Sequence, residues 1–254
     1  MYEINSSNHP QRLLMLGNSF TFFNEMPSRF LQPMLNAARL NVQVTAVTRP
    51  NYYLHQYFDE SLEAGQAVRA LLREQHFDFV LIQEQSNLPI ADPPAFYRSV
   101  RVLNRLIRES GATPWLYQTW GYGAGNEDLA QFGENTQQME MKLRASYQAI
   151  GRELSIPVAP VGAAMTRALD LGVADLYNQQ DHYHPSAVAS EMIAKTLMAS
   201  LFGVHPQDVP FVGAADAETR ALLDSAADWA AFSDVTADPK YQMDSVRLCD
   251  PAQN

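Results

Sequence analysis

Residues 13–21 read Leu13-Leu14-Met15-Leu16-Gly17-Asn18-Ser19-Phe20-Thr21, an apolar run that ends abruptly in a glycine and short polar residues. A continuous apolar run is typical of a strand buried on both faces of a parallel sheet. Because ligands bind outside the carboxyl ends of the strands in open α/β sheets, we expect the Ser19 hydroxyl at the functional edge. Most serines after a strand only form turns or cap helices, so Ser19 needs partners before chemistry can be assigned to it.

The rest of the chain alternates between strand and helix patterns. Apolar, β-branched runs predict further strands over 42–48, 77–82, 113–119 and 156–161. Helical spacing predicts helices over 24–40, 53–73 (with Gly65 as a candidate break), 96–110, 139–154, 162–171, 186–202 and 215–232. This alternation predicts the α/β class: a three-layer α/β/α sandwich on a flavodoxin-like, five-stranded parallel sheet of order 2-1-3-4-5. We expect a single domain over 1–254, with its core at about 12–203 and a C-terminal helix and tail at 204–254.

Composition and charge narrow the classes of partner. The formal net charge of the 254-residue chain is −10, so no attraction to nucleic acid is expected. No run of 18 or more apolar residues predicts a membrane span, and the first residues, MYEINSSNHPQR, lack the basic and apolar regions of a secretory signal, which makes the cytoplasm the default expectation. The single cysteine, Cys249, permits no intrachain disulfide and has no obvious activating neighbour.

A carboxylate and an imidazole lie three residues apart near the end of the predicted core, as Asp181 and His184. Cleavage of an ester by serine needs a base, a carboxylate that orients the base, and donors for the oxyanion. A separation of three brings both side chains to one side of a single turn, so Asp181 can bond one ring nitrogen while the other faces Ser19. Two alternatives stay open. His184, which precedes Pro185, could be only a residue at the start of a helix. Alternatively, Asp181, His182 and His184 could be metal ligands.

The block at 17–21 and Asp181-x-x-His184-Pro185-Ser186 together resemble the SGNH (GDSL-like) hydrolase superfamily, nearest to a branch with a G-N-S-F-T first block and a Q-E-Q-S third block, here 83–86. The resemblance spans about residues 12–203. It implies that Ser19 is the nucleophile, that Asp181 and His184 complete the triad, and that the oxyanion hole uses the Ser19 N–H, a second-block N–H and a third-block amide. By position, Asn51 replaces the family's glycine and Gln85 its asparagine. Asn51 therefore needs a glycine-like conformation, and Gln85, longer by a methylene, must be placed differently.

The near competitor is the α/β-hydrolase fold, which also places a serine after a strand. Its nucleophile lies mid-chain in G-x-S-x-G, with the acid well before the histidine. Here Ser19 follows the first strand, position 21 is threonine, and Asp181 precedes His184 by three. This order disfavours the competitor.

The sequence thus predicts a serine esterase that cleaves small acyl esters, such as acetyl groups on carbohydrates, through an acyl-enzyme, with no cofactor or metal and with a small-molecule ester as its partner. The alternatives are a ligand-binding protein with weakened catalysis and a metal-dependent hydrolase using Asp181, His182 and His184. The glycine-rich loop 120–128 does not match G-x-G-x-x-G and favours a flexible lid or rim. Glu84 is expected to brace the site loops. The candidates for substrate contact are Asn18, Tyr52, Trp120 and Tyr183. Aromatic residues at the base of a loop pack in the core about as often as they line a pocket.

Overall fold

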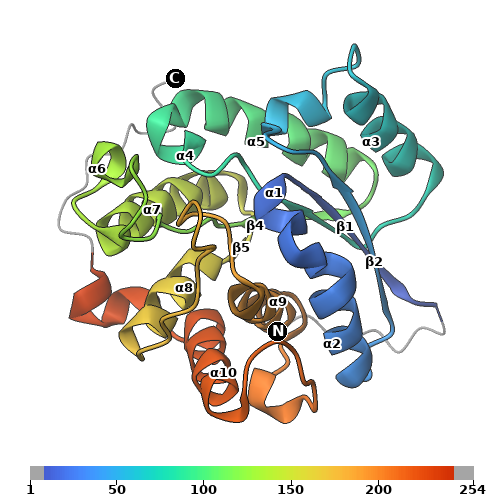
Figure 1. Ribbon diagram of the computed structural model, residues 1–254. Helices are drawn as coiled ribbons and strands as arrows, with labels where there is room; N and C mark the ends of the chain where they lie inside the picture. Colours follow the sequence, from blue (N-terminus) through green and yellow to red (C-terminus); the bar gives the residue numbers. More distant parts are fainter. Residues whose placement is uncertain (1–8, 243–254) are drawn as a thin grey trace.

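A computed structural model describes residues 9–242 of the chain. Within them, five strands form one parallel sheet in the order β2-β1-β3-β4-β5 (Figure 1). The strands are β1 (Gln11–Gly17), β2 (Val42–Thr48), β3 (Phe79–Ile82), β4 (Thr113–Tyr117) and β5 (Val158–Ala159). The central strand β1 pairs with β2 on one side and with β3 on the other, so that Leu13 lies opposite both Val44 and Phe79. The predicted strand order and fold class are confirmed.

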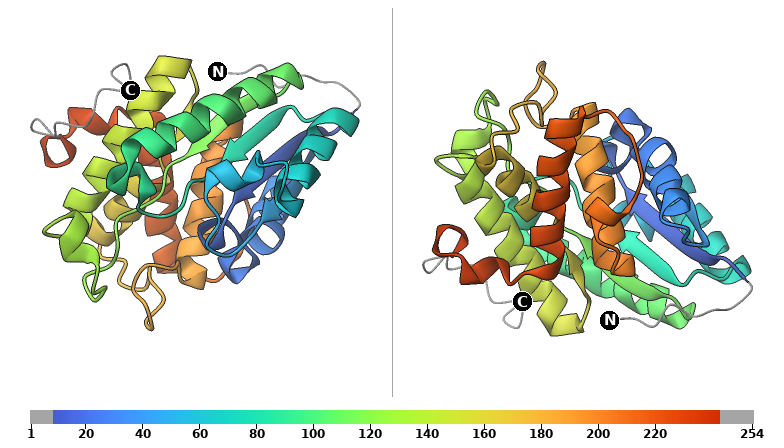
Figure 2. Two further views of the ribbon diagram at one scale, coloured as in Figure 1. Left: turned by 90° about the horizontal axis from the view of Figure 1, so that it is seen from above. Right: turned by 90° about the horizontal axis from the view of Figure 1, so that it is seen from below.

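Alternation along the strands divides the core between the two faces of the sheet. Leu13 and Met15 of β1 join one cluster of buried residues, whereas Leu14 and Leu16 join the other. Successive side chains of a strand point to opposite faces, so a fully apolar strand must be covered by helices on both sides. The main covering helices are α2 (Gln32–Ala37), α8 (Val161–Asp170) and α9 (Ala187–Phe202) on one face, and α3 (Glu63–Glu74) and α5 (Pro93–Glu109) on the other. Figure 2 shows these layers from above and below.

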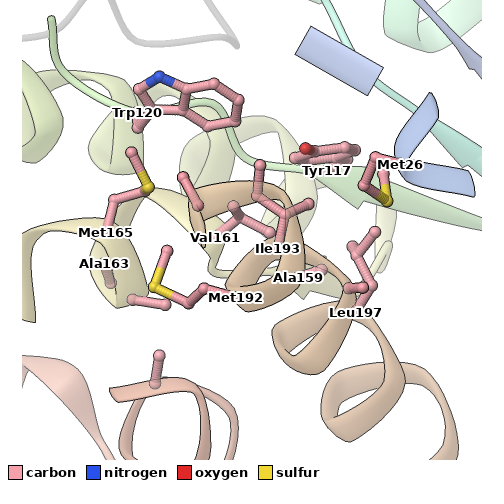
Figure 3. Packing of buried hydrophobic residues seen from close by; sticks show 14 of the residues in the cluster. Met26, Tyr117, Trp120, Ala159, Val161, Ala163, Met165, Met192, Ile193 and Leu197 are labelled. Carbon is pink, nitrogen blue, oxygen red and sulfur yellow. The ribbon is translucent and has the colours of Figure 1, made fainter. Parts of the chain in front are cut away.

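Helix α7 (Thr136–Leu154) contributes to both clusters, and α10 (Ala217–Phe232) packs outside α8 and α9. Part of the larger cluster lies between β4, α8 and α9 and includes Tyr117 and Ile193 (Figure 3). Lys195 of α9 donates to Asp224 of α10 at 2.6 Å. The helix predicted over 215–232 is therefore present as α10, and it is attached to α9 by apolar packing and by a partly buried ion pair.

The helix predicted over 24–40 is interrupted. Helix α1 (Ser19–Phe22) begins earlier, and a turn at 23–25 separates it from a π-helical segment (Met26–Leu31) that continues into α2. Asn24 and Glu25 take left-handed φ angles of 55° and 56°, which end the first helix. Pro27 then lies in the first turn of the new segment, where its missing N–H costs nothing.

The helix predicted over 53–73 is also two elements. A 3₁₀ turn (Leu54–Tyr57) and a loop precede α3, which begins at Glu63. The break does not lie at Gly65, because this glycine is inside α3 and lets the loop pack on the helix: a Cβ there would lie 2.0 Å from the Asp59 carbonyl oxygen. A short helix, α4 (Leu88–Ala91), occupies part of a predicted loop, and β3, β4 and β5 are shorter than predicted.

In the described part of the chain, no helix combines the length and the apolar character needed to cross a bilayer. The expectations for Cys249 and for the end of the C-terminal tail concern positions outside residues 9–242.

Candidate active site

The carboxyl ends of β1, β2 and β3 lead into one pocket of about 190 Å³. Of the residues singled out from the sequence, it contains Ser19, Asn51, Gln85, Asn18 and Tyr183. Polar side chains predominate in its full lining, which consists of Asn18, Ser19, Phe20, Asn51, Gln85, Ser86, Asn87, Tyr122, Asn126, Asp128 and Tyr183.

Ser19 is the first residue of α1, directly after the turn that follows β1. Asn18 caps this helix, since its Oδ1 accepts the backbone N–H of Phe20 at 3.1 Å. The first N–H groups of a helix have no partner within the helix. The Ser19 N–H has no acceptor elsewhere in residues 9–242 either, so it remains available beside the Ser19 hydroxyl.

The amide of Gln83 fixes the turn that carries Ser19. Its Oε1 accepts the Asn18 N–H at 3.0 Å and the Thr21 hydroxyl at 2.8 Å, and its Nε2 donates to Asn18 Oδ1 at 3.0 Å. Gly17 makes room for this amide, because a Cβ at that position would lie 2.6 Å from Gln83 Oε1. The sequence alone did not point to a role for Gln83. The signal available was the run of polar residues at 83–87, directly after a buried strand.

Asn51 has a left-handed backbone with φ of 56°. It is the third residue of a turn in which the Tyr52 N–H bonds the Arg49 carbonyl at 3.4 Å and Pro50 is second. Proline at the second position and a positive φ at the third are the pattern of a type II turn. This is the glycine-like conformation that the oxyanion prediction required. The N–H of Asn51 has no acceptor within the described residues.

The Gln85 amide is oriented by its own loop. Its Oε1 accepts the N–H groups of Asn87 at 3.1 Å and Leu88 at 3.2 Å, which determines the side on which the nitrogen lies. Its Nε2 donates to Ser86 Oγ at 3.1 Å, and the other Nε2 hydrogen has no partner within residues 9–242. Ser86 Oγ is in turn 2.7 Å from the Tyr122 hydroxyl. The pocket therefore holds three uncommitted donors, on Ser19, Asn51 and Gln85.

Asp181 and His184 are directly hydrogen-bonded. Asp181 Oδ2 lies 2.8 Å from His184 Nδ1, while Oδ1 accepts the N–H groups of Tyr183 and His184, both at 3.0 Å. Burial acts to raise the pKa of Asp181, but the bonds from the Tyr183 N–H, the His184 ring and the His184 N–H outweigh it, so this pKa lies below its usual value. An ionised Asp181 favours the tautomer in which Nδ1 carries the proton and Nε2 is free to accept one.

The imidazole of His184 packs against the segment that begins at Ser19. It stacks on the Phe23 ring, with centroids 4.5 Å apart and planes 11° from parallel, and it meets the edge of Phe20 at 5.9 Å. Within the described residues, His184 Nε2 has no hydrogen-bond partner, and Ser19 Oγ is not bonded to it. The structure thus brings the predicted base and the predicted nucleophile to the same end of the sheet.

His182 lies apart from His184. Its φ is 54°, its carbonyl accepts the Gly123 N–H at 2.7 Å, and its ring packs on Gly125, where a Cβ would come within 2.6 Å. Among residues 9–242, no group of three or more His, Cys, Asp and Glu side chains is arranged to hold a metal ion. The metal alternative built on Asp181, His182 and His184 therefore has no support in this geometry.

Trp120 belongs to the core rather than to the pocket, which corrects its assignment as a substrate contact. The indole is fully buried in the larger core cluster (Figure 3). It stacks on Phe20, with ring centroids 4.2 Å apart and planes 3° from parallel. Its Nε1 donates to the Tyr183 carbonyl at 3.0 Å. Tyr52 does not line the pocket either: its ring packs near Tyr57, and its carbonyl accepts Asn18 Nδ2 at 2.9 Å.

The glycine-rich loop has two parts. Its start is packed, because a Cβ at Gly121 would lie 2.1 Å from the Thr136 carbonyl oxygen, so this part is no flexible lid. Farther along, Asn126 and Asp128 line the pocket as its rim. The sequence predicts the loop but not these two residues, because nothing in their local pattern distinguishes them from other polar loop residues.

Glu84, in the segment that follows β3, is completely buried. Its Oε1 accepts the N–H groups of Leu54 at 3.0 Å and Gln85 at 2.7 Å. Burial raises the pKa of this carboxyl to about 7, although the two hydrogen bonds oppose the shift. The contacts agree with the expected role in bracing the loops.

Comparison with family models and with curated proteins gives no match. Comparison with solved structures does. A DUF4886 family protein from Bacteroides uniformis has a TM-score of 0.73 at 16% identity, with 91% of this chain and 96% of that chain covered. An acetyl xylan esterase, AlAXEase, has a TM-score of 0.54 at 8% identity, with 75% and 100% covered. At these identities both show the fold alone.

A candidate SGNH hydrolase from Slackia heliotrinireducens shares more of the sequence. It is 30% identical, with a TM-score of 0.63, and the match covers 74% of this chain and 97% of that chain. The sheet order, the helices on both faces and this level of identity agree. The chain belongs to the SGNH hydrolase superfamily.

Proposed function

We propose that this protein is a serine esterase that cleaves small acyl esters through a covalent acyl-enzyme, with Ser19 as nucleophile, His184 as base and Asp181 as its orienting carboxylate. The observation that carries the proposal is the 2.8 Å contact between Asp181 and His184, on a ring that stacks against the segment following Ser19. Membership of the SGNH superfamily, and the esterase among the structural neighbours, support the same reaction class.

The proposed reaction has two halves. Ser19 Oγ attacks the acyl carbon while His184 Nε2 accepts the hydroxyl proton, and the resulting imidazolium is stabilised by Asp181. When the tetrahedral intermediate collapses, the alcohol leaves with the proton from Nε2. Water then attacks the acyl group with His184 again as base, releasing the acid and restoring Ser19. Hydrogen bonds of this kind tighten when substrate binds, so their absence between Ser19 and His184 in the free protein is compatible with the mechanism.

The oxyanion is proposed to accept from the Ser19 N–H, the Asn51 N–H and Gln85 Nε2. Support comes from the fact that each group lines the same pocket and has a hydrogen without a partner in the described chain. Donors held in place before the reaction stabilise the developing charge without having to reorganise. The left-handed backbone of Asn51 supplies what a glycine otherwise supplies.

The size and chemistry of the pocket favour a short acyl group on a polar alcohol. Its volume of about 190 Å³ is below the ~300 Å³ that sites for drug-sized ligands usually reach. Amide and hydroxyl side chains dominate the lining, and they suit a hydroxylated partner such as an acetylated carbohydrate better than a lipid.

The test is hydrolysis of p-nitrophenyl acetate together with labelling by a fluorophosphonate, which forms a stable adduct with an activated serine. We expect turnover, and one adduct per chain that peptide mass spectrometry locates at Ser19. Ser19→Ala should abolish both. Ser28→Ala removes an exposed hydroxyl outside the pocket and should change neither. If the wild-type protein is not labelled, the esterase proposal is wrong and the ligand-binding alternative gains support.

A further inference from the structure

Glu84 is a buried carboxylate that the proposed reaction does not use. It is fully inaccessible to solvent and does not line the pocket, so it cannot meet substrate. Burying a carboxylate is costly unless it is well hydrogen-bonded. Yet Oε1 alone accepts two backbone N–H groups, and Oε2 has no partner within the described residues. At this strand end, the two hydrogen bonds to Oε1 are the contacts that offset the cost of burial.

Those two bonds join different parts of the site. The Leu54 N–H follows the turn that presents Asn51, and the Gln85 N–H belongs to the residue whose side chain faces the pocket. One oxygen therefore ties the segment after β2 to the segment after β3. Leu54 is itself fully buried, so in the native protein solvent does not reach this N–H and the carboxylate is its acceptor.

The same segments are also connected through the nucleophile turn. Asn18 Nδ2 donates to the Tyr52 carbonyl at 2.9 Å, and Gln83 Nε2 donates to Asn18 Oδ1 at 3.0 Å. Since Gln83 and Glu84 are neighbours in the chain, these contacts and the Glu84–Leu54 bond close a ring. The ring runs through the segments that follow β1, β2 and β3. Each of these segments also contains one of the proposed oxyanion donors, which are on Ser19, Asn51 and Gln85.

We propose that Glu84 is a positioning residue: by accepting the N–H groups of Leu54 and Gln85 on one oxygen, it sets the separation of the Asn51 and Gln85 donors so that both reach one oxyanion. This inference rests on the proposed esterase function. We call these two hydrogen bonds, from the Leu54 and Gln85 N–H groups to Glu84 Oε1, the tether. The tether needs an acceptor oxygen at the Oε1 position and does not need a second free carboxylate oxygen. The amide of Glu84→Gln supplies that oxygen, whereas Glu84→Ala removes it.

Steady-state kinetics on p-nitrophenyl acetate tests this, with each rate divided by the fraction of chains that a fluorophosphonate labels at completion. We expect Glu84→Ala to lower kcat about 100-fold, in the range found when an oxyanion donor is lost, with KM within about twofold. Glu84→Gln should stay within about threefold of wild type. In a Gln85→Ala background, Glu84→Ala should cost about tenfold or less, because one of the donors that it positions is already gone.

The matched control is Glu191→Ala. Glu191 is also fully buried and accepts one backbone N–H, that of Ala215, at 3.0 Å on the far side of α9. Glu191→Ala should destabilise the fold while leaving kcat per labelled chain unchanged. Either of two results would overturn the positioning role. In the first, the kcat losses of Glu84→Ala and Gln85→Ala multiply in the double variant. In the second, Glu84→Gln is as slow as Glu84→Ala.

Amide hydrogen exchange separates this inference from the esterase proposal because it needs no turnover. In Glu84→Ala, the Leu54 and Gln85 amides should exchange at least tenfold faster, whereas in Glu84→Gln and Glu191→Ala they should stay protected. Unchanged protection in Glu84→Ala would refute the tether even if the protein is an esterase. A wild-type protein with the expected exchange but no esterase activity would refute the function and leave the tether standing.

Discussion

The side-chain amide of Asn24 donates to the carbonyl oxygen of Pro185 at 2.9 Å, across 161 residues of sequence. The same nitrogen lies 2.9 Å from Ser190 Oγ in α9. Asn24 follows the helix that starts with Ser19, and Pro185 follows His184, so this contact joins the two halves of the proposed triad. The left-handed φ of 55° at Asn24 turns the amide toward Pro185.

Replacing Asn24 should therefore affect both stability and turnover. Asn24→Ala loses both bonds and places a Cβ in a left-handed backbone, which together should cost about 2–3 kcal/mol of unfolding free energy. Asn24→Gly loses the bonds without the strain and should cost about 1 kcal/mol less. Both variants should lower kcat roughly 10- to 100-fold, because small displacements of catalytic groups are expensive. Denaturant titration and p-nitrophenyl acetate kinetics measure the two effects.

Asn36→Ala is the control for Asn24. Asn36 is exposed, and within residues 9–242 its side chain bonds only that of Gln32, so neither quantity should change appreciably. Equal losses in Asn24→Gly and Asn36→Ala would show that the contact with Pro185 does not hold the two halves together.

Asp181→Asn should remove most activity while keeping the local fold. The amide oxygen can still accept the backbone N–H groups of Tyr183 and His184, but its nitrogen would face His184 Nδ1 as a donor. That reverses the tautomer, so Nε2 carries the proton and cannot act as base. We expect kcat/KM to fall by roughly 10³–10⁴, the loss typical of this change in a serine triad. A variant that keeps a tenth of wild-type activity would mean that Asp181 does not orient the base.

Local patterns were enough to predict the sheet and the turn at Pro50 and Asn51. The alternation of Leu13 to Leu16 between two core clusters requires helices on both faces, which leaves few arrangements for five parallel strands. Pro50 and Asn51 form their turn through preferences that belong to the two residues themselves. Asp181 and His184 are close in sequence, so their contact needs no knowledge of distant segments.

Features that depend on distant partners could not be predicted in this way. At the kink, the Asn24 amide bonds the Pro185 carbonyl, and nothing near residue 24 in the sequence signals that bond. The position of Trp120 after a strand predicts a pocket residue, but the ring of Phe20, in α1, stacks on it. An aromatic residue after a strand serves the core or the pocket according to what stands opposite, which only the tertiary structure decides.

Asp128 should make the site prefer cationic over anionic esters. It is the only acidic residue in the pocket lining, all of which lies in the described chain, and the lining contains no lysine or arginine. At a separation of about 5 Å, such a charge is worth roughly 1 kcal/mol, or about fivefold in kcat/KM. Asp128→Asn should therefore lower the ratio of acetylthiocholine to phenyl acetate hydrolysis about fivefold, and should raise the relative rate on 4-acetoxybenzoate.

These ratios should be measured at low ionic strength, where screening is weakest. Asp208→Asn removes an exposed charge outside the pocket and should leave them unchanged. If Asp128→Asn alters the three rates equally, Asp128 contributes to the shape of the rim and not to charge selection.

The buried carboxyl of Glu84 should make the protein less stable as the pH rises. Burial raises its pKa from 4.5 to about 7 in the folded state, and Tyr147, whose own pKa burial raises, is the titratable group that interacts with it. Between these two values the unfolded chain has lost the proton that the folded chain still holds, so unfolding becomes easier with each pH unit. Above about pH 7 Glu84 is ionised in both the folded and the unfolded state, and the effect is complete.

Glu84→Gln cannot titrate at this position, so the wild type should lose about 3 kcal/mol of unfolding free energy relative to this variant between pH 4.5 and 8. Denaturant titrations of both proteins at the two pH values measure the difference, in which the contributions of all other groups cancel. A constant gap between wild type and Glu84→Gln would mean that Glu84 ionises in the folded protein as readily as in the unfolded one.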